Sequence, residues 1–481
     1  MSIDPHIRRL ALSCLLLGFQ GPTPPRWLLD CLADGLGGVV LFGSNLRGND
    51  VRALTESLRK AAGQDIVVAL DEEGGDVTRL DDTRGSASPG AAALGFLDDP
   101  VVTEQVYGAI GARLAHCGVT LDLAPVADVN LDPLNPVIGV RSFGADPEVA
   151  SRQVAAAVRG LQHSGTAACV KHFPGHGATR ADSHHQVATL DRSRAQLESV
   201  EYAPFRAAIA AGARSIMTGH LLVPALDAGN LATVSAAITT GVLRDELGFT
   251  GTVVTDALEM RALSGTIGML DGFVRALAAG ADAIETGALE HPQLVAEIPA
   301  AVARAIDGGQ LTLERLRDAA ARTARLAGPG DPSAGFDPDI AAGAAARCIE
   351  VLGTLPPLTA PLVLECRPPG GMASGELPWT LAEPLAALVR GTQVLTVRGP
   401  DDLAAIAPRS AGRSLVAVVR DPARYPWQQQ VVAAAQAHPA AVLVDVGWPG
   451  PSAPQLPAIR TRGVAPGLLA AAAAVLAGAD R

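Results

Sequence analysis

Eight short apolar segments recur along the first 290 residues, and stretches with helical periodicity, such as NDVRALTESLRKAAG and PEVASRQVAAAVRGLQHSG, separate them. Apolar strands that alternate with helices form parallel sheets, and eight such units in about 320 residues predict a (β/α)8 barrel of the TIM type. The segments are SCLLLG (13–18), GGVVLFG (37–43), DIVVALD (65–71), VTLDLAP (119–125), ACVKHF (168–173), SIMTGH (215–220), GTVVTD (251–256) and ADAIETG (281–287).

The composition changes after about residue 328, where GPGDPSAGFDPD (328–339) is typical of a linker. IAAGAAARCIEVLG predicts a helix, and four further apolar segments follow: APLVLEC (360–366), GTQVLTV (391–397), RSLVAVVRD (413–421) and AAVLVDVG (440–447). We therefore expect a barrel domain at 1–328, a linker and connecting helix at 329–350, and a smaller α/β sandwich domain at 351–481. The second domain is expected to serve packing or oligomerisation first and to contribute to the active site second, and the sequence leaves the oligomeric state open.

The stretch IRRLALSCLLLGFQG near the start, with basic residues before an apolar run, allows two interpretations. One is a weak signal peptide, and the other is a first barrel strand at about 13–17. We favour the strand, because the barrel needs one there. The six cysteines are scattered without a C-x-x-C pair, and several lie in apolar runs. Buried, reduced thiols and a cytoplasmic location are therefore expected.

The chain carries a net charge of −11, with 48% hydrophobic and 18% charged residues. This composition is typical of a folded globular protein. The negative charge argues against nucleic acid or an anionic membrane as a partner and suits an enzyme of small substrates. No apolar run reaches the roughly 18–20 residues of a membrane span.

Polar residues follow several predicted strands at the point where each strand ends. Asp71, His172, His220 and Asp256 occupy such positions. All carboxyl ends of the strands open on one face of a barrel, where active sites are built. The sequence therefore predicts that these four distant residues converge. Asp256 there is either a nucleophile or an electrostatic stabiliser.

The stretch KHFPGHGATRADSHH (171–185) holds four of the ten histidines of the chain. Asp182 and His184 are two residues apart and point to the same side of an extended segment. A carboxylate that accepts the imidazole Nδ1–H leaves Nε2 facing the site, which is the arrangement of a catalytic dyad. The histidines also permit a metal site, but Pro174 and Gly175 interrupt the spacing, and Lys171 would place a cation beside the metal.

Two arginines lie in loops that follow predicted strands. In DEEGGDVTRL the glycine turn lets Arg79 return toward Asp71, either around a polyhydroxylated ligand or in a plain salt bridge. Arg141 lies in NPVIGVRSFGADP, which is either a functional loop or an ordinary surface loop. We expect Glu259 to form a salt bridge on the helix after Asp256.

These stretches resemble glycoside hydrolase family 3, and within it the bacterial β-N-acetylhexosaminidase (β-N-acetylglucosaminidase) branch. The resemblance covers most of residues 10–328, and the C-terminal part is similar to the sandwich domain of two-domain members. Its motifs occur in the order of the family: DEEGGDVTRL, APVADVN, NPVIGVRSFGADP, KHFPGHGATRADSHH and GFTGTVVTDALEM.

The resemblance implies roles for individual residues. Asp256 matches the nucleophile of a retaining mechanism, His184 the general acid/base, and Asp182 its dyad partner. It also implies a small glycan substrate, no metal and no organic cofactor, and a place in recycling of cell-wall or chitin fragments. The sugar hydroxyls and the acetamido pocket would be contacted by Asp71, Arg79, Arg141, Lys171 and His172.

Several alternatives stay open at this point. An imidazole, with a reference pKa of about 6.5, suits acid/base work near neutral pH, and a neutral imidazole does not repel phosphate as an acceptor. A phosphorylase with the same residues is therefore an alternative to a hydrolase. A non-catalytic sugar-binding barrel, a metal-dependent amidohydrolase barrel and a β-glucosidase are disfavoured. Ala257 stands where many relatives carry a second Asp, and 3% aromatic residues favour a short glycan over a long polymer.

Overall fold

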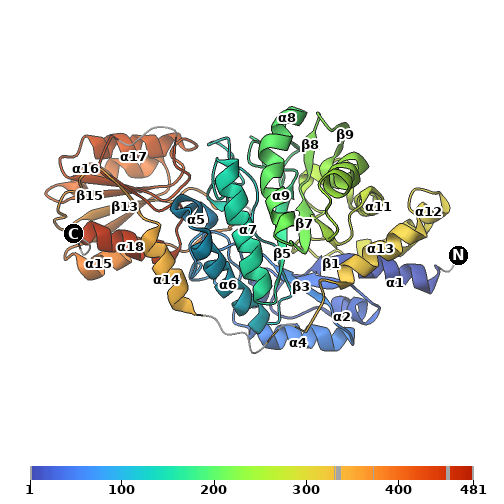
Figure 1. Cartoon of the computed structure of the whole chain (residues 1–481). Helices are drawn as coiled ribbons and strands as arrows, with labels where there is room; N and C mark the ends of the chain where they lie inside the picture. The colour runs from blue at the N-terminus through green and yellow to red at the C-terminus, as the bar shows by residue number, and fades with distance from the viewer. Residues whose placement is uncertain (1–2, 330, 332–336, 372, 451–454, 479–481) are drawn as a thin grey trace. The chain divides into compact units, whose positions relative to one another are not determined.

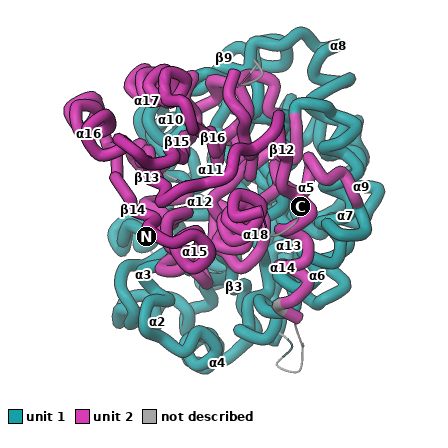
Figure 2. The backbone as a smooth tube through the Cα atoms, turned by 90° about the vertical axis from the view of Figure 1, so that its left-hand side faces the viewer, with its two compact units in different colours: residues 1–73, 100–129, 145–336 teal, residues 74–99, 130–144, 337–481 magenta. Residues whose placement is uncertain are grey.

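The structure is a computed structural model, and it describes residues 3–329, 331, 337–371, 373–450 and 455–478. The chain forms two compact units, and neither is continuous in sequence (Figure 2). Unit 1 comprises residues 1–73, 100–129 and 145–336, and unit 2 comprises residues 74–99, 130–144 and 337–481. The predicted linker falls partly outside the described residues.

Unit 1 is built on the predicted barrel, and each of the eight predicted segments coincides with one of its strands, although β5 begins at Ala167, one residue before its segment. The strands pair in parallel in the order β10-β7-β5-β4-β3-β2-β1-β11, and a bridge between Val254 and Ala283 joins the two outer strands (Figure 1). Their bounds are β1 Leu15–Gly18, β2 Gly38–Val40, β3 Val67–Leu70, β4 Leu121–Asp122, β5 Ala167–Phe173, β7 Ser215–Thr218, β10 Thr252–Thr255 and β11 Ile284–Glu285.

The inside of the barrel changes from apolar to charged within two residues along the strands. One buried cluster joins inward-facing residues of seven strands with Ala283, which directly precedes β11; Ala69, Cys169 and Val254 are among its members. Successive strand residues point to opposite faces, so the residue two positions later faces the same interior. Those next positions are occupied by Asp71, Lys171, Asp256 and Glu285. The barrel therefore carries its charges at the carboxyl ends of the strands.

Helices surround this barrel, and capping residues mark where they begin and end. Asp50 accepts hydrogen bonds from the N–H groups of Arg52 and Ala53 in the first turn of α4. Gly63, with φ of +64°, caps the other end of that helix. The principal helices of unit 1 are α1 Pro5–Ser13, α2 Arg26–Ala33, α3 Gly43–Leu46, α4 Val51–Ala62, α6 Pro100–His116, α7 Pro147–His163, α8 Arg194–Gln196, α9 Tyr202–Ala210, α10 Arg261–Ser264, α11 Met269–Ala279, α12 Pro292–Asp307 and α13 Leu313–Ala324.

Two elements of unit 1 differ from the sequence-based expectation. The predicted first strand begins at Leu15, because residues 5–13 form α1, which Asp4 caps through the N–H of His6. A second, three-stranded sheet consists of β6 Ala188–Thr189, β8 Leu221–Val223 and β9 Asp227–Leu231. The sequence did not predict them, because β6 and β9 contain polar residues and β8 is an apolar run of only three residues.

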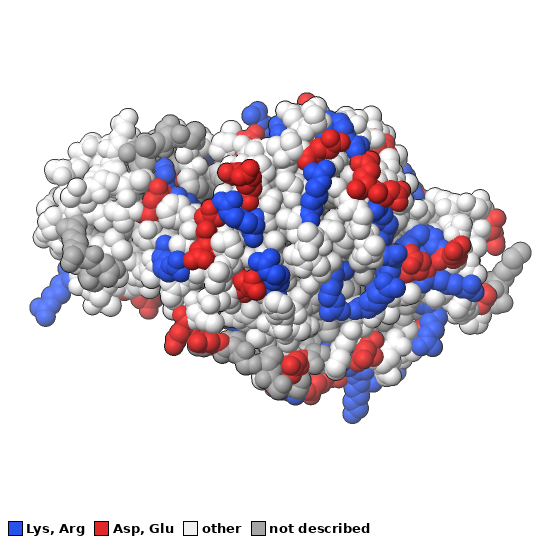
Figure 3. All heavy atoms as spheres, viewed as in Figure 1, with Lys and Arg blue, Asp and Glu red and all other residues white. Residues whose placement is uncertain are grey.

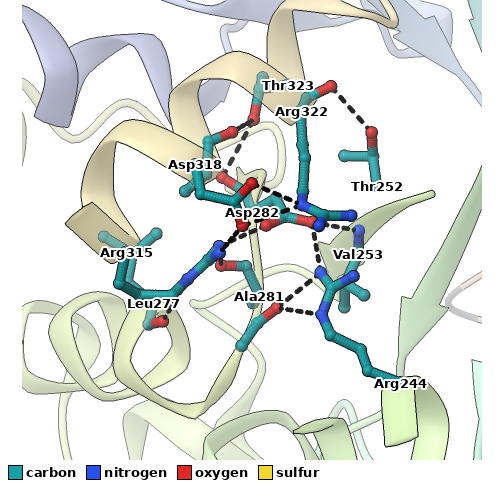
Figure 4. A network of polar contacts seen from close by, with 12 residues as sticks. Arg244, Thr252, Val253, Leu277, Ala281, Asp282, Arg315, Asp318, Arg322 and Thr323 are labelled. Carbon is teal, nitrogen blue, oxygen red and sulfur yellow. Dashed lines mark hydrogen bonds and ion pairs between the residues drawn. The ribbon is translucent and has the colours of Figure 1, made fainter. Parts of the chain in front are cut away.

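An ion-pair network lies at the opposite, amino-terminal end of the barrel strands (Figure 4). Asp282, which is fully buried, accepts from Arg244 at 2.6 Å and also from Arg315. Its carboxylate additionally accepts the N–H of Val253 at 2.8 Å, at the start of β10. The Thr323 hydroxyl donates to the Asp282 carbonyl at 3.0 Å. One carboxylate thus connects α13, β10 and the segment before β11.

Unit 2 is built on a six-stranded sheet in the order β12-β17-β16-β15-β13-β14, with helices on both faces. Four predicted segments form β13 Leu362–Cys366, β14 Gln393–Val397, β15 Leu415–Val419 and β16 Ala441–Asp445. The helix predicted over IAAGAAARCIEVLG is wrong at its end, because α14 stops at Arg347 and β12 follows at Glu350–Leu352. The strand β17 Ala458–Arg460 was not predicted. The helices of the unit are α5 Ala91–Leu97, α14 Pro338–Arg347, α15 Ala382–Leu388, α16 Ile406–Ser410, α17 Pro426–Gln436 and α18 Pro466–Ala477.

The surface and the thiols agree with a globular chain. All six cysteines are free, and Cys14, Cys169, Cys348 and Cys366 are buried, as the sequence predicts. None of the described helices combines the length and the apolar character needed to cross a bilayer. On the face drawn in Figure 3, acidic and basic side chains are interspersed.

Candidate active site

Lys171 lies at the centre of the charged layer of the barrel. Its ammonium group, 2% exposed, contacts Asp71 at 2.6 Å and Glu73 at 2.8 Å. A buried cation of this kind requires carboxylate partners, and here two partners come from one segment after β3. Asp71 is the more accessible carboxylate, with 17% of its side chain exposed. The structure therefore unites Asp71 and Lys171, and it adds Glu73, to which the sequence analysis gave no role.

His172, the next residue on β5, is oriented by a buried carboxylate. Its Nδ1 lies 2.7 Å from Asp128 Oδ2, and its backbone N–H donates to Asp128 Oδ1 at 3.2 Å. Burial raises the pKa of Asp128, but the His172 and His176 groups around it outweigh this effect and the net pKa is lowered. An ionised Asp128 accepts the Nδ1 proton of His172 and leaves Nε2 available, since no described residue bonds to it.

His176 orders the loop that leads to the predicted dyad. Its Nδ1 lies 2.6 Å from the Thr179 hydroxyl, and its Nε2 lies 3.0 Å from the Ser183 hydroxyl. Burial lowers the pKa of His176 to about 4, so the ring is neutral at pH 7. Because both ring nitrogens are occupied, His176 holds the loop in place and has no atom left for a ligand.

Asp182 and His184 form the predicted pair. His184 Nδ1 lies 2.7 Å from Asp182 Oδ1, and the His184 backbone N–H donates to the same oxygen at 2.9 Å. Burial raises the pKa of Asp182, but these bonds outweigh it and lower the net pKa. His184 is 23% exposed, and its Nε2 makes no hydrogen bond with a described residue. The loop is tied to α10, because the carbonyls of Ser183 and His184 accept N–H groups of Ala262 and Arg261.

Asp256, at the end of β10, lies near His172 and near the His184–Asp182 pair. Burial raises the pKa of Asp256, whereas the imidazoles of His172, His220 and His184 outweigh burial and lower the net pKa. Its Oδ1 accepts the N–H of Ala257 at 2.8 Å, which leaves Oδ2 without a partner among the described residues. The expected salt bridge of Glu259 is wrong: its Oε2 is buried without a hydrogen-bond partner.

His220 fixes the turn that carries Asp256. Its Nε2 lies 3.0 Å from the Ala257 carbonyl, and its Nδ1 lies 2.8 Å from the Thr233 hydroxyl. A carbonyl only accepts, so Nε2 carries a proton. Burial lowers the pKa of His220, which favours the neutral form of the ring. The sequence placed His220 at the mouth correctly, but its role is to position the Asp256 turn.

The two predicted arginines belong to unit 2. Arg79 Nη1 donates to the Ala373 carbonyl at 3.1 Å, and Arg141 Nη1 donates to the Val137 carbonyl at 3.1 Å. Arg141 ends a short 3-10 helix and is 9% exposed. Their predicted contact with a sugar stays a prediction.

Taken together, the residues of unit 1 place an ionised carboxylate near two imidazoles, each with a free Nε2 and an Asp-bound Nδ1. An ionised carboxylate and an imidazole with an open nitrogen are the groups that nucleophilic and acid/base chemistry require, and the Lys171 cluster adds charged groups of both signs. The described residues contain no group of three or more His, Cys, Asp or Glu side chains suited to a metal ion. Sequence reasoning missed Asp128 and Glu285, although Asp128 stands in the quoted motif APVADVN.

Comparison with known proteins gives consistent results. The family model described as the glycosyl hydrolase family 3 N-terminal domain matches residues 29–326. The chain is 33% identical over 316 residues to a β-hexosaminidase A of Pseudoalteromonas piscicida. The aligned region covers 60% of this chain and 53% of that protein. A β-hexosaminidase of Xylella fastidiosa is 34% identical over 60% of this chain and 87% of its own length. A solved family 3 β-N-acetylglucosaminidase from a Paenibacillus species superposes with a TM-score of 0.89 at 30% identity, covering 98% and 96% of the two chains.

Proposed function

This chain belongs to glycoside hydrolase family 3, and we propose that it is a retaining exo-β-N-acetylhexosaminidase that hydrolyses terminal β-linked N-acetylglucosamine. The names of its relatives, β-hexosaminidase and β-N-acetylglucosaminidase, support this substrate class. We further propose short glycans, such as muropeptide or chitin fragments, as substrates, and cell-wall recycling in the cytoplasm as the setting.

One observation carries the proposal: the Asp256 carboxylate is held ionised beside the His184–Asp182 pair. A nucleophilic carboxylate must be charged to attack, and a general acid must present a proton at an accessible atom. Asp256 satisfies the first condition, and His184, with Nδ1 bound and Nε2 open, satisfies the second. Retaining glycosidases commonly use two carboxylates, and here an imidazole takes the place of the second.

In the first step, Asp256 Oδ2 attacks C1 of the terminal sugar while the bond from C1 to the leaving oxygen breaks. Protonated His184 gives its Nε2 proton to that oxygen, and the sugar becomes an ester of Asp256. In the second step, neutral His184 takes a proton from water as the water oxygen attacks C1 and the ester bond breaks. Two inversions at C1 give a product with the original β configuration.

The remaining residues have supporting roles in this proposal. Asp71, Lys171 and His172 are proposed to contact the sugar at the carboxyl ends of the barrel strands, and Arg79 and Arg141 are proposed as further sugar-binding residues. Asp182 keeps the His184 ring in the Nδ1–H form and stabilises its charged state. The loop from Gly175 to Gln186 delivers His184, and its mobility during the cycle is part of the proposal.

The proposal is tested by turnover of 4-nitrophenyl N-acetyl-β-D-glucosaminide, with the matching glucoside as control. The expected product is free N-acetylglucosamine, formed at the same rate with and without millimolar phosphate. Preference for the glucoside would contradict the proposed substrate class. Formation of a sugar 1-phosphate would contradict hydrolysis, although the same residues would still act.

A further inference from the structure

Glu285, at the end of β11, is a buried acid that the proposed reaction does not use. It follows Ala283 by two positions on the last strand of the barrel, so it faces the same interior, in the layer that also carries Asp71, Lys171 and Asp256. The residue is 5% exposed, and its Oε2 is fully shielded without a hydrogen-bond partner among the described residues. A buried carboxyl oxygen in that state costs stability unless a ligand bonds to the group.

The backbone holds Glu285 in this position from both sides. Its N–H donates to the Thr255 hydroxyl at 3.1 Å, and its carbonyl accepts the N–H of Leu258 at 3.0 Å. On the other side, the Thr286 N–H donates to the Leu16 carbonyl at 3.0 Å. The backbone of Glu285 is therefore bonded on both sides of Asp256, to Thr255 and to Leu258.

The surroundings of Glu285 are acidic. Burial raises the pKa of Glu285 well above its ordinary value, and the nearby charges of Asp71 and Asp256 raise it further. Lys171 acts in the opposite direction, but it already contacts two carboxylates. Burial and these charges therefore favour the neutral carboxylic acid form of Glu285, which has one O–H donor and one carbonyl acceptor.

We propose that Glu285 is a further substrate-binding residue, whose carboxyl group bonds a hydroxyl group of the terminal sugar beside Asp71 and Asp256. A hydroxyl both donates and accepts, so it satisfies both functions of the acid without placing another negative charge beside the nucleophile. This inference rests on the proposed function, since it names a contact for the same sugar. It makes Glu285 a determinant of which sugar configuration the pocket accepts.

One rival explanation lies next to Glu285. A Cβ added to Gly287 would lie 2.3 Å from Glu259 Oε1, so a second carboxyl occupies the neighbouring space, and its Oε2 is also buried without a partner. If the two acids only stabilise each other, Glu285 is structural, and its removal should affect every substrate by the same factor. A contact with one hydroxyl predicts a loss that depends on that hydroxyl.

The test combines Glu285 variants with substrates that lack single hydroxyl groups. Turnover is measured for 4-nitrophenyl N-acetyl-β-D-glucosaminide and its 3-, 4- and 6-deoxy analogues, with the wild type, Glu285→Leu, Glu285→Gln and Glu259→Gln. We expect Glu285→Leu to lower kcat/KM on the parent about 10- to 100-fold. On one deoxy analogue, the same variant should match the wild type within about 3-fold. Glu285→Gln, which is neutral and both donates and accepts, should retain kcat/KM within about 5-fold.

The outcomes separate this inference from the proposed function. A wild type without turnover on the parent defeats the proposed function and the inference with it. A normal wild type with Glu285→Leu unchanged, or equally impaired on all four substrates, overturns the inference alone. Equal losses in Glu285→Gln and Glu285→Leu would also overturn it, because they would show that the charged form is required. The Glu259→Gln control should change all four substrates by one common factor.

Discussion

At the scale of single residues, the site contains two Asp–His pairs rather than one. His172 pairs with Asp128, and His184 pairs with Asp182, both at 2.7 Å between Nδ1 and the carboxylate oxygen. The difference is exposure: His172 is 6% exposed on a strand, whereas the side chain of His184 is 23% exposed on a loop. An acid/base must reach both the leaving group and water, which favours His184, whereas the buried pair suits binding of the sugar.

This difference predicts distinct kinetics for two matched variants. His184→Ala should lower kcat strongly, about 100-fold or more, on substrates with poor leaving groups and much less on activated aryl glycosides, which need little protonation. His172→Ala should lower kcat/KM by one factor across the same series. The measurement is kcat/KM against the pKa of the leaving group. Equal slopes for the two variants would reject the assignment of His184 as the acid.

Individual residues also show which parts of the site could be predicted from the sequence. Asp71, His172, His220 and Asp256 were placed at the mouth because a parallel barrel gathers its strand ends, and that argument needs no side-chain geometry. Asp128 and Glu285 gave no comparable signal, because one stands among apolar residues after a two-residue strand and the other in a strand of two residues. Their roles depend on which side chain turns inward, which only the structure shows.

At the scale of elements, the loop from His176 to Ser183 positions the proposed acid/base through one neutral imidazole. The pKa of His176 is about 4 in the fold, and the reference value is 6.5. Between these values the unfolded loop binds more protons than the folded one, so loop stability is complete above pH 6.5 and declines as the pH falls toward 4. The full decline is about 3 kcal/mol.

The prediction is therefore that the loop loosens in acid through His176. Hydrogen exchange of the segment 174–187 should show protection that falls between pH 7 and pH 4.5 in the wild type, relative to His176→Gln. His163→Gln is a matched control, since the side chain of His163 is 74% exposed at the end of α7. A pH dependence that is the same in the wild type and His176→Gln would contradict the role of this ring.

At the scale of the whole molecule, the barrel and the sheet of unit 2 followed from the pattern of apolar segments. All eight barrel strands and four strands of the second sheet were predicted, because each buried parallel strand is a continuous apolar run. The short strands β6, β8, β9, β12 and β17 were not, because β6 and β9 contain polar residues and β8, β12 and β17 have only three residues each. The discontinuous division into units was not visible either, since it depends on how loops pack.

The network around Asp282 predicts where unit 1 is most sensitive to substitution. Asp282→Ala leaves two partly buried guanidinium groups without their carboxylate, and we expect a loss of about 3–5 kcal/mol in unfolding free energy. Asp271→Ala is the matched control, because its carboxylate is 55% exposed and 3.7 Å from Arg275, and it should cost less than about 0.5 kcal/mol. Denaturant unfolding of both variants checks this.

Because Asp282 lies at the end of the barrel opposite the mouth, Asp282→Ala should keep the kcat of the wild type per folded molecule at 25 °C. If Asp282→Ala and Asp271→Ala had the same free energy of unfolding, the network would contribute nothing to the stability of the fold. A normal stability with lost activity would place Asp282 in the function instead.

The central claim is that Asp256 forms a covalent bond with the sugar, and one measurement tests it directly. The protein is incubated with a 5-fluoro N-acetylglucosaminyl fluoride, which forms the intermediate quickly and releases it slowly, and is then digested and analysed by mass spectrometry. The account predicts one sugar adduct per chain, carried by Asp256 and absent from Asp256→Asn. Turnover of the aryl substrate without any adduct, or an adduct on another residue, would contradict it.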